Sequence, residues 1–204
     1  MSMYRPRPYA IDDGQILREV LRKRVFATLA AIVEGRVAFA YAPLVVDARG
    51  LRFHLARANP LASLDDGMRV SLSVLACDAY ISPDWYRTTV TVPTWNYISV
   101  ECEGPVRRLP GEELRPLVVE LSAQEEARLA PKPEWTLDKV PEARVEALLN
   151  GITGFAMSFE RLEGKFKLSQ DKSPEDVAGA IEALESRGDA AGRAVAEAMR
   201  RTRQ

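Results

Sequence analysis

The chain has 204 residues, 47% of them hydrophobic and 28% charged, a composition typical of one ordinary globular domain that excludes fibrous and wholly disordered classes. Its formal net charge is −1, so the chain as a whole has no electrostatic attraction for nucleic acid. Any contact with DNA would need a local basic patch or a partner.

The two cysteines and the hydropathy pattern indicate a cytoplasmic protein. Cys77 and Cys102 lie far apart and lack metal-ligand spacing, which is typical of reduced, core-type cysteines. The apolar runs are far shorter than the roughly 20 residues of a membrane-spanning helix, and the first residues do not resemble a secretion signal. We therefore expect a cytoplasmic location and no membrane segment.

The N-terminal part predicts an extended arm followed by one helix. Pro6 and Pro8 favour the arm. Residues 12–24 begin with two aspartates and end with bases, which suits a helix dipole. The apolar residues of this stretch share one helical stripe: Ile16, Leu17, Val20 and Leu21.

Strand-like patterns dominate the next 80 residues. They are Val25 to Val33, Arg36 to Val46, Leu51 to Ala56, Arg69 to Cys77 and Tyr97 to Glu103. Glu34-Gly35 and Asp47 to Gly50 suit hairpin turns, so the first three runs predict an antiparallel meander.

Helices and one more strand are expected in the remainder. The predicted helices cover residues 111–128, 141–150, 177–187 and 190–200, and a sixth strand covers Ile152 to Leu162. Ser173 followed by Pro174 is a typical helix start, and Gly188 a typical stop. This order predicts a mainly β (α+β) fold, a barrel of about six antiparallel strands with peripheral helices.

The stretch from Leu51 to Pro60 holds the only histidine of the chain. Strand alternation places His54 on the face opposite Phe53. In a straight strand Arg57 would point away from His54, so both can serve one ligand only if the chain turns at about Ala56. The Asn-Pro pair that follows favours such a turn.

Four polar and aromatic islands interrupt the apolar pattern: His54 to Pro60, Tyr80 to Tyr86, Pro93 to Tyr97, and Lys165 to Gln170. No catalytic triad, glycine-rich phosphate loop or metal-binding cluster accompanies them. Each island also has a plainer interpretation. His54 can be a structural hydrogen-bonding residue, Arg57 a surface salt bridge, and the tryptophans core or interface anchors.

Taken together, the islands resemble a known family. His54-Leu-Ala-Arg-Ala-Asn-Pro60, Ala79-Tyr-Ile-Ser-Pro-Asp-Trp-Tyr86, Val92-Pro-Thr-Trp-Asn-Tyr97 and Arg161 to Gln170 are similar, in order, to motifs of the PaiB-like FMN-binding negative transcriptional regulators. The resemblance implies an FMN-binding split β-barrel of the pyridoxamine-phosphate-oxidase-like kind. It also implies a homodimer with FMN between subunits, a barrel domain over residues 1–170 and a helical appendage over 171–204.

The resemblance further implies a set of site residues. Arg57, Ala58 and Asn59 would hold the FMN phosphate with His54 nearby, and the other cofactor contacts would be Thr94, Trp95, Asn96, Lys167, Ser169 and Gln170. Tyr41, Tyr80 and Trp85 would shape a small-molecule pocket, and no catalytic residue is assigned. The chain departs from the family pattern at Tyr41, Val90 and Glu101, where the family commonly has histidine, lysine and histidine.

Three functions agree with the residue patterns and the family resemblance. The first is a flavin-binding regulator that acts through flavin or a partner rather than by direct DNA reading. Its only basic tail, Arg187, Arg193, Arg200, Arg201 and Arg203, also suits helix ends and solubility. The second is a flavin-dependent oxidoreductase acting on a small substrate or NAD(P)H. The third is a dimeric barrel that has lost its ligand.

Overall fold

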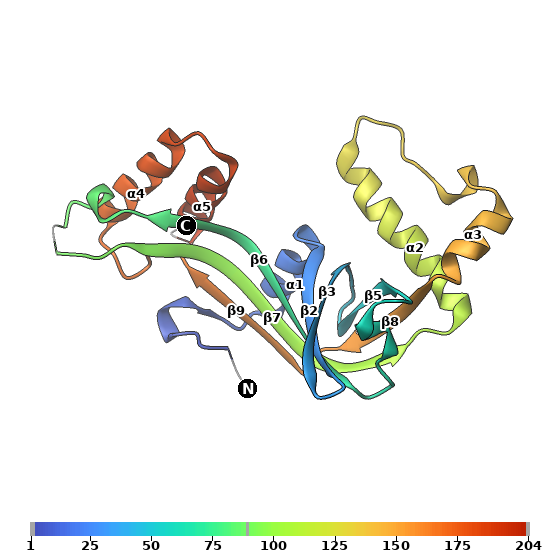
Figure 1. The fold of residues 1–204 in the computed structure, drawn as a ribbon. Coiled ribbons are helices and arrows are strands. Elements are labelled where there is room, and N and C mark those ends of the chain that lie inside the picture. Colours follow the sequence, from blue (N-terminus) through green and yellow to red (C-terminus); the bar gives the residue numbers. More distant parts are fainter. Residues whose placement is uncertain (1–2, 89, 203–204) are drawn as a thin grey trace. The chain divides into compact units, whose positions relative to one another are not determined.

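The structure, a computed structural model, describes residues 3–88 and 90–202 (Figure 1). Within these residues it contains nine strands and five α-helices. The strands are β1 (Ala10–Ile11), β2 (Phe26–Val33), β3 (Arg36–Pro43), β4 (Val45–Val46), β5 (Gly50–Ala56), β6 (Arg69–Ile81), β7 (Thr94–Arg108), β8 (Ile152–Ser158) and β9 (Arg161–Lys167). The α-helices are α1 (Gly14–Lys23), α2 (Gly111–Glu126), α3 (Glu142–Leu149), α4 (Pro174–Ser186) and α5 (Ala190–Arg201).

The chain forms two compact units, each built from several segments. The barrel unit comprises Arg18–Val74 and Cys102–Leu162. The terminal unit comprises the residues up to Leu17, Leu75–Glu101, and the residues from Glu163 onward. Strands β6 and β7 contribute residues to both units, and α4 and α5 belong to the terminal unit. The expected domain boundary after residue 170 stays a prediction.

All strands with a determined register pair antiparallel, in the order β3-β2-β6-β7-β8-β5-β4, with β9 pairing β7 and β1. The mainly β prediction with peripheral helices is confirmed. The predicted meander is present, but its second run, Arg36 to Val46, is two strands, of which β3 pairs with β2 and β4 pairs with β5, each antiparallel. Pro43 ends β3, and a proline has no backbone N–H with which to continue a ladder.

The strand boundaries also differ from the sequence prediction: β6 continues to Ile81 rather than ending at Cys77, and β7 runs from Thr94 to Arg108 rather than from Tyr97 to Glu103. The expected single strand from Ile152 to Leu162 is two strands, because the chain leaves the ladder at Phe159 and Glu160. The Phe159 N–H donates to the carbonyl of Arg49 and the Glu160 N–H to that of Glu103. The second of these strands, β9, extends to Lys167. Together with β1 and β4, which were also not expected as separate strands, it raises the number of strands in the described residues from six to nine.

The barrel unit buries apolar side chains between and beside its strands. On β5 the alternation is as predicted, with Leu51, Phe53 and Leu55 buried, and the Phe53 ring stacks on Phe155 of β8 with a centroid distance of 5.4 Å. Helix α2 covers a second cluster, formed by Val45, Leu109, Leu114, Leu117 and Leu121. Pro116 lies in the second turn of α2, and the helix continues past it to Glu126.

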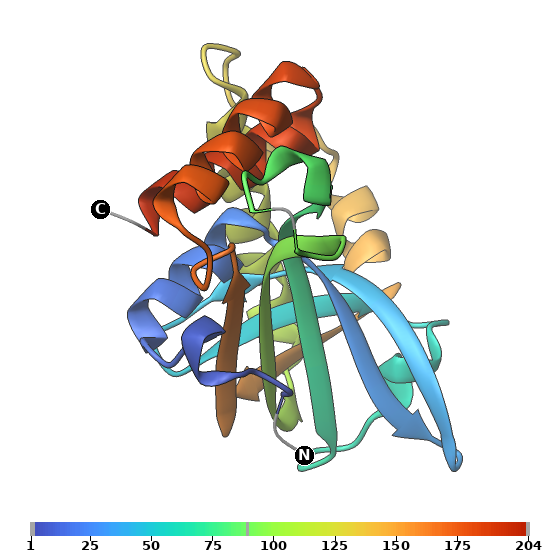
Figure 2. The ribbon, with the colours of Figure 1, turned by 90° about the vertical axis from the view of Figure 1, so that its left-hand side faces the viewer.

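The terminal unit buries its apolar residues under the two C-terminal helices, which lie side by side (Figures 1 and 2). The core there joins Ala79 and Ile81 of β6 to Val177 and Leu184 of α4 and Val195 of α5. In the barrel unit the buried β6 residues are the even-numbered Val70, Leu72 and Val74. The buried positions of β6 thus change from even to odd numbers as the strand passes into the terminal unit.

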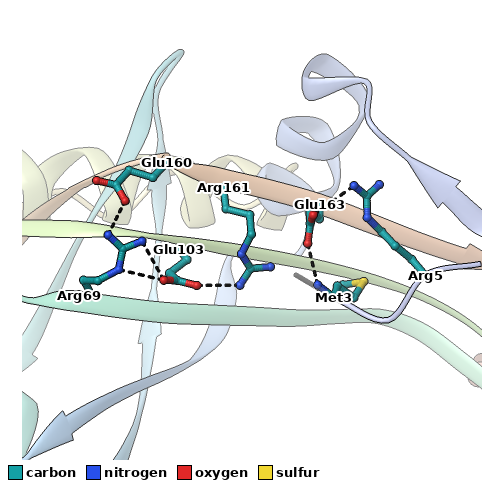
Figure 3. A network of polar contacts seen from close by, with 7 residues as sticks. All are labelled: Met3, Arg5, Arg69, Glu103, Glu160, Arg161 and Glu163. Atoms are coloured by element: carbon teal, nitrogen blue, oxygen red, sulfur yellow. Dashed lines mark hydrogen bonds and ion pairs between the residues drawn. The ribbon is translucent and has the colours of Figure 1, made fainter. Parts of the chain in front are cut away.

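Ion pairs hold strands together within each unit, as Figure 3 shows. In the barrel unit, Arg69 lies 2.8 Å from a carboxylate oxygen of Glu103 and also pairs with Glu160, while Arg161 bonds to Glu103 at 3.0 Å. These two guanidiniums lower the pKa of Glu103. In the terminal unit, buried Glu163 accepts from the Met3 N–H at 2.8 Å and from Arg5 at 3.1 Å, which fastens the N-terminal arm to β9.

Candidate functional site

The chain turns sharply where β5 ends. β5 stops at Ala56, and the Asn59 N–H donates to the Ala56 carbonyl at 2.8 Å. The Asn59 side-chain oxygen then accepts from the Leu61 N–H at 2.9 Å and caps the short 3-10 helix η2 (Pro60–Ser63). The predicted turn at about Ala56 is therefore confirmed, and its cause is the Asn-Pro cap.

This corner leaves hydrogen-bond donors without partners. The Arg57 N–H is used, because it donates to the Gly151 carbonyl at 2.8 Å. Within the described residues, the exposed guanidinium of Arg57 makes no hydrogen bond or ion pair, and the Ala58 N–H has no acceptor. A cation beside a free backbone N–H is the donor combination that proteins use to bind a phosphate or carboxylate.

Arg57 and Asn59 line a pocket of about 920 Å³ in the barrel unit. Its polar lining also includes Glu34 of the β2–β3 turn, Arg108 at the end of β7, and Glu146 of α3. Its apolar lining includes Leu109, Leu114, Leu149 and Ile152. This volume lies near the upper end of the range for small-molecule sites, which combine an apolar lining with a few polar groups.

A glycine in β8 allows α2, which forms one wall of this pocket, to pack closely against that strand. Gly154 of β8 lines the pocket, and a Cβ atom there would lie 2.5 Å from a methyl group of Leu114 and 3.1 Å from one of Leu109. Only a residue without a side chain fits between β8 and α2 at this point. No pattern in the sequence predicted this close contact between α2 and β8.

His54 lies on the face of β5 opposite the Phe53 stack, in register with Gly154. It is not among the residues that line the pocket. Burial lowers the pKa of its imidazole, so His54 is neutral at neutral pH, and its buried Nδ1 has no partner within the described residues. His54 accordingly brings no positive charge to an anion at Arg57.

The remaining cofactor residues expected from the sequence lie in the terminal unit, where the structure brings them together in pairs. Lys167 Nζ donates to the Thr94 hydroxyl and, at 3.0 Å, to the Trp95 carbonyl. Partial burial lowers the pKa of Lys167. The Asn96 amide donates to the Ser169 hydroxyl at 2.9 Å.

Two of these residues are buried and hold the fold of the terminal unit. Asn96 and Ser169 are buried, and the Ser169 hydroxyl also lies 3.2 Å from that of Tyr86. Ser169 has a φ of 61°, in the left-handed region, and its hydrogen bonds stabilise this conformation. Gln170 bonds to the backbone of Phe166 and Leu168, so its side chain is also used locally.

The three residues expected to shape a small-molecule pocket occupy different surroundings. In the terminal unit, Tyr80 is exposed and meets Trp95 edge to face at 6.2 Å, while Trp85 in the short helix η3 (Pro83–Trp85) packs against the α4–α5 core. In the barrel unit, Tyr41 is exposed and stacks on Phe26. Of the positions that depart from the family pattern, Val90 is fully exposed and Glu101 is half-buried.

Within residues 3–88 and 90–202, no three His, Cys, Asp or Glu side chains are placed to hold a metal ion. No helix in the same part of the chain has both the length and the apolar character needed to cross a membrane. Neither cysteine is in a disulfide.

Comparison with known proteins identifies the family. Residues 3–161 match the family model described as "Putative FMN-binding domain". The chain belongs to this family. Its PaiB-like character is confirmed by 28% identity over 203 residues to "Protease synthase and sporulation protein PAI 2" of Bacillus subtilis (strain 168), covering 97% of this chain and 96% of that protein. The expected cofactor, FMN, is the one for which the family is described.

Solved structures confirm the split-barrel fold. The FAD and heme binding protein of Mycobacterium smegmatis superposes with a TM-score of 0.60 at 18% identity, covering 83% of this chain and 79% of that one. The flavocytochrome Anf3 of Azotobacter vinelandii gives a TM-score of 0.57 at 17% identity, covering 83% of this chain and 75% of that one.

Proposed function

We propose that the chain is a cytoplasmic FMN-binding protein that acts as a homodimer, with a regulatory output exerted through its flavin or a partner. The observation that carries the FMN proposal is the unpartnered guanidinium of Arg57, which lines the pocket of the barrel unit. Arg57, the Ala58 N–H and the Asn59 side chain would hold the phosphate, and the apolar lining would exclude water from the ring system. When bound, the flavin supplies electron or hydride transfer.

The homodimer is supported by an apolar face on the β2–β3 hairpin. In the antiparallel register, Ala30 faces Phe39 and Ile32 faces Val37. Five large side chains of this face are each more than half exposed: Phe26, Ile32, Val37, Phe39 and Tyr41. An apolar patch of this kind on a protein surface marks an interaction site, and a second copy of the chain is the occupant we propose.

A regulatory output by direct reading of a DNA groove is not favoured by the charges of α4 and α5. Arg200 pairs with Glu185 at 2.6 Å and Arg201 with Glu197 at 2.6 Å. Arg187 pairs with Asp189 at 2.9 Å. The carboxylates therefore neutralise much of the tail that looked basic in the sequence, and Arg203 lies outside the described residues. A mobility shift with promoter DNA should show at most salt-sensitive, sequence-independent binding.

FMN titration tests the phosphate assignment. Flavin fluorescence quenching is measured for the wild type, for Arg57→Ala, and for Arg49→Ala, which removes the same charge from the barrel unit outside the pocket. A hydrogen bond to a charged group contributes about 1.5–3 kcal/mol, so Arg57→Ala should weaken FMN binding by about 10- to 100-fold. The control should bind as the wild type does. Equal affinities in all three proteins would overturn the assignment.

A flavin-dependent oxidoreductase is the second candidate function. The volume of the pocket favours it, because about 920 Å³, near the upper end of the range for small-molecule sites, leaves room for a substrate beside the flavin. FMN-dependent consumption of NADH or NADPH by the purified protein would support the enzyme. Unchanged reduced nicotinamide after prolonged incubation would favour the regulator.

A further inference from the structure

The sheet of the terminal unit has an exposed aromatic surface on the face opposite α4 and α5. Ala79 and Ile81 of β6 and Ile98 of β7 pack into the α4–α5 core, so the alternate residues of these two strands point away from it. Two of those residues, Tyr80 and Trp95, are 42% and 52% exposed. Their rings meet edge to face with centroids 6.2 Å apart, and both remain open to a ligand.

Lys165 of β9 lies on the same face and has no anionic partner. Its Nζ lies 5.4 Å from the ring centroid of Tyr97, which shares the face of Trp95, and 4.9 Å from that of Tyr4. The residue is only 9% exposed, yet in the part of the chain that the structure describes Nζ makes no hydrogen bond and no ion pair. Nζ is also not among the fully enclosed polar atoms. A buried ammonium with three unused N–H donors is suited to receive an anion from outside the chain.

The Tyr4 ring can move aside to admit such an anion. Tyr4 is 82% exposed, and a cation–π contact at an exposed site is weak. The backbone on either side of it is held by Glu163, which accepts from the Met3 N–H at 2.8 Å and from Arg5 at 3.1 Å (Figure 3). A ligand can therefore replace the ring on Lys165 while the N-terminal arm stays attached.

The other charges of this face favour a ligand with a single negative charge. Asp78 precedes Tyr80 by two residues on β6, and Glu101 follows Tyr97 by four residues on β7. Strand alternation places both carboxylates on the aromatic face. They disfavour a strand of nucleic acid, whose closely spaced phosphates would meet them. A ligand with one anionic group encounters less of this repulsion.

We propose that this face of the terminal unit binds a small aromatic carboxylate. The ring of the ligand stacks on Trp95, its carboxylate accepts from Lys165 Nζ, and the Tyr4 ring moves aside. Trp95 and Tyr97 are alternate residues, roughly 7 Å apart along β7, a span that an aryl group with a short acid side chain covers. The residues of this site all belong to the terminal unit, whereas the pocket proposed for FMN lies in the barrel unit. The inference therefore does not depend on the proposed function.

Calorimetric titration of the full chain with indole-3-acetate tests the proposal. Indole-3-acetamide lacks the charge and acetate lacks the ring, so each should bind at least about 10-fold more weakly. Lys165→Met should weaken indole-3-acetate binding by about 10-fold or more, and Lys165→Arg, which keeps the charge, should retain most of it. Lys172→Met is the matched control, because Lys172 also lies over a tyrosine ring, that of the buried Tyr86 in the α4–α5 core. It should match the wild type.

Two substitutions of exposed side chains serve if Lys165→Met does not fold. Trp95→Leu should weaken indole-3-acetate binding by about two- to tenfold, because the ring contact is lost. Tyr4→Ala should tighten it by about two- to fivefold, because the ligand no longer displaces a ring. Equal affinities for the acid and its amide, or equal affinities in the wild type and all these variants, would overturn the inference.

Three further measurements distinguish other occupants of this face. Saturating FMN should leave the affinity for indole-3-acetate unchanged, and displacement by FMN would overturn the inference in favour of the flavin. Trp95→Leu should leave the sedimentation mass unchanged, and a lower mass would show that a second copy covers the face. Tighter binding of a thymidine oligonucleotide at physiological salt would overturn the inference in favour of single-stranded nucleic acid. Failure of the wild type to bind FMN, with indole-3-acetate binding intact, would overturn only the proposed function.

Discussion

Asp176 ties the start of α4 to the segment that follows η3. Its carboxylate is buried and accepts from the Arg87 N–H at 2.7 Å, the Thr88 N–H at 3.0 Å and the Thr88 hydroxyl at 2.7 Å. These hydrogen bonds, the Thr88 hydroxyl first, lower the pKa of Asp176. The carboxylate of Asp176 is therefore stabilised in its negatively charged form when the chain is folded.

This geometry predicts a pH dependence of stability. A carboxyl group with a lowered folded pKa stabilises the fold above its unfolded pKa of about 3.9, and this stabilisation disappears as the pH falls through the folded value. Asp176→Asn should lower the Tm at pH 7 by several degrees. When the pH is lowered from 7 to below about 4, the variant should lose less further stability than the wild type does. Thermal melts from pH 7 to pH 2.5 measure both. An equal fall of the Tm in both proteins as the pH decreases below about 4 would contradict the role of the charge.

For single residues, the sequence predicted the positions of some members of the candidate site and not of others. Alternation predicted the faces of His54 and Phe53, and the Asn-Pro pair predicted the turn before Arg57, because both depend on neighbouring residues. Arg108 gave no local signal. Its place in the pocket depends on the contact with Leu64, which is 44 residues away in sequence. The pairing of Lys167 with Thr94 likewise spans 73 residues.

At the scale of elements, one close approach between α4 and η3 can be tested. Gly179 lies within α4, and a Cβ atom there would lie 2.3 Å from the Trp85 carbonyl oxygen. Alanine normally stabilises a helix interior by about 1 kcal/mol over glycine. Here Gly179→Ala should instead lower the free energy of unfolding by about 1–3 kcal/mol, because backbone must move.

Gly111→Ala is the matched control for this substitution. Gly111 is the first residue of α2, and a Cβ atom there would meet nothing within 4 Å. This variant should leave the free energy of unfolding unchanged or raise it by up to about 1 kcal/mol. Urea unfolding measures both variants. Similar changes in the two would show that helix propensity, and not the contact with Trp85, determines the result.

Element types were predictable from periodicity, whereas partners and ends were not. The helices from Gly111, Pro174 and Ala190 follow local proline, cap and spacing signals, and all three are present. The split of the stretch after Ile152 into β8 and β9 depends on hydrogen bonds from Phe159 and Glu160 to distant carbonyls. Burial of β6 first on even and then on odd positions likewise reflects what packs on each part of the strand.

At the scale of the whole molecule, the proposed homodimer gives the exposed apolar face of β2 and β3 a partner. Phe39 lies near the middle of β3, opposite Ala30, and its side chain is 62% exposed. Its substitution therefore removes few contacts within the chain. A charge placed in a desolvated interface between two copies would cost several kcal/mol, which is enough to dissociate a dimer of moderate affinity.

Phe39→Glu should therefore convert a dimer into a monomer while leaving thermal unfolding of the isolated chain nearly unchanged. Sedimentation equilibrium over a range of concentrations measures the mass. Val119→Glu is the matched control, because Val119 is a comparably exposed apolar residue on α2, outside this face. It should leave the dimer intact. A wild-type chain that stays monomeric at high concentration, or a dimer that tolerates Phe39→Glu, would rule out this face as the interface.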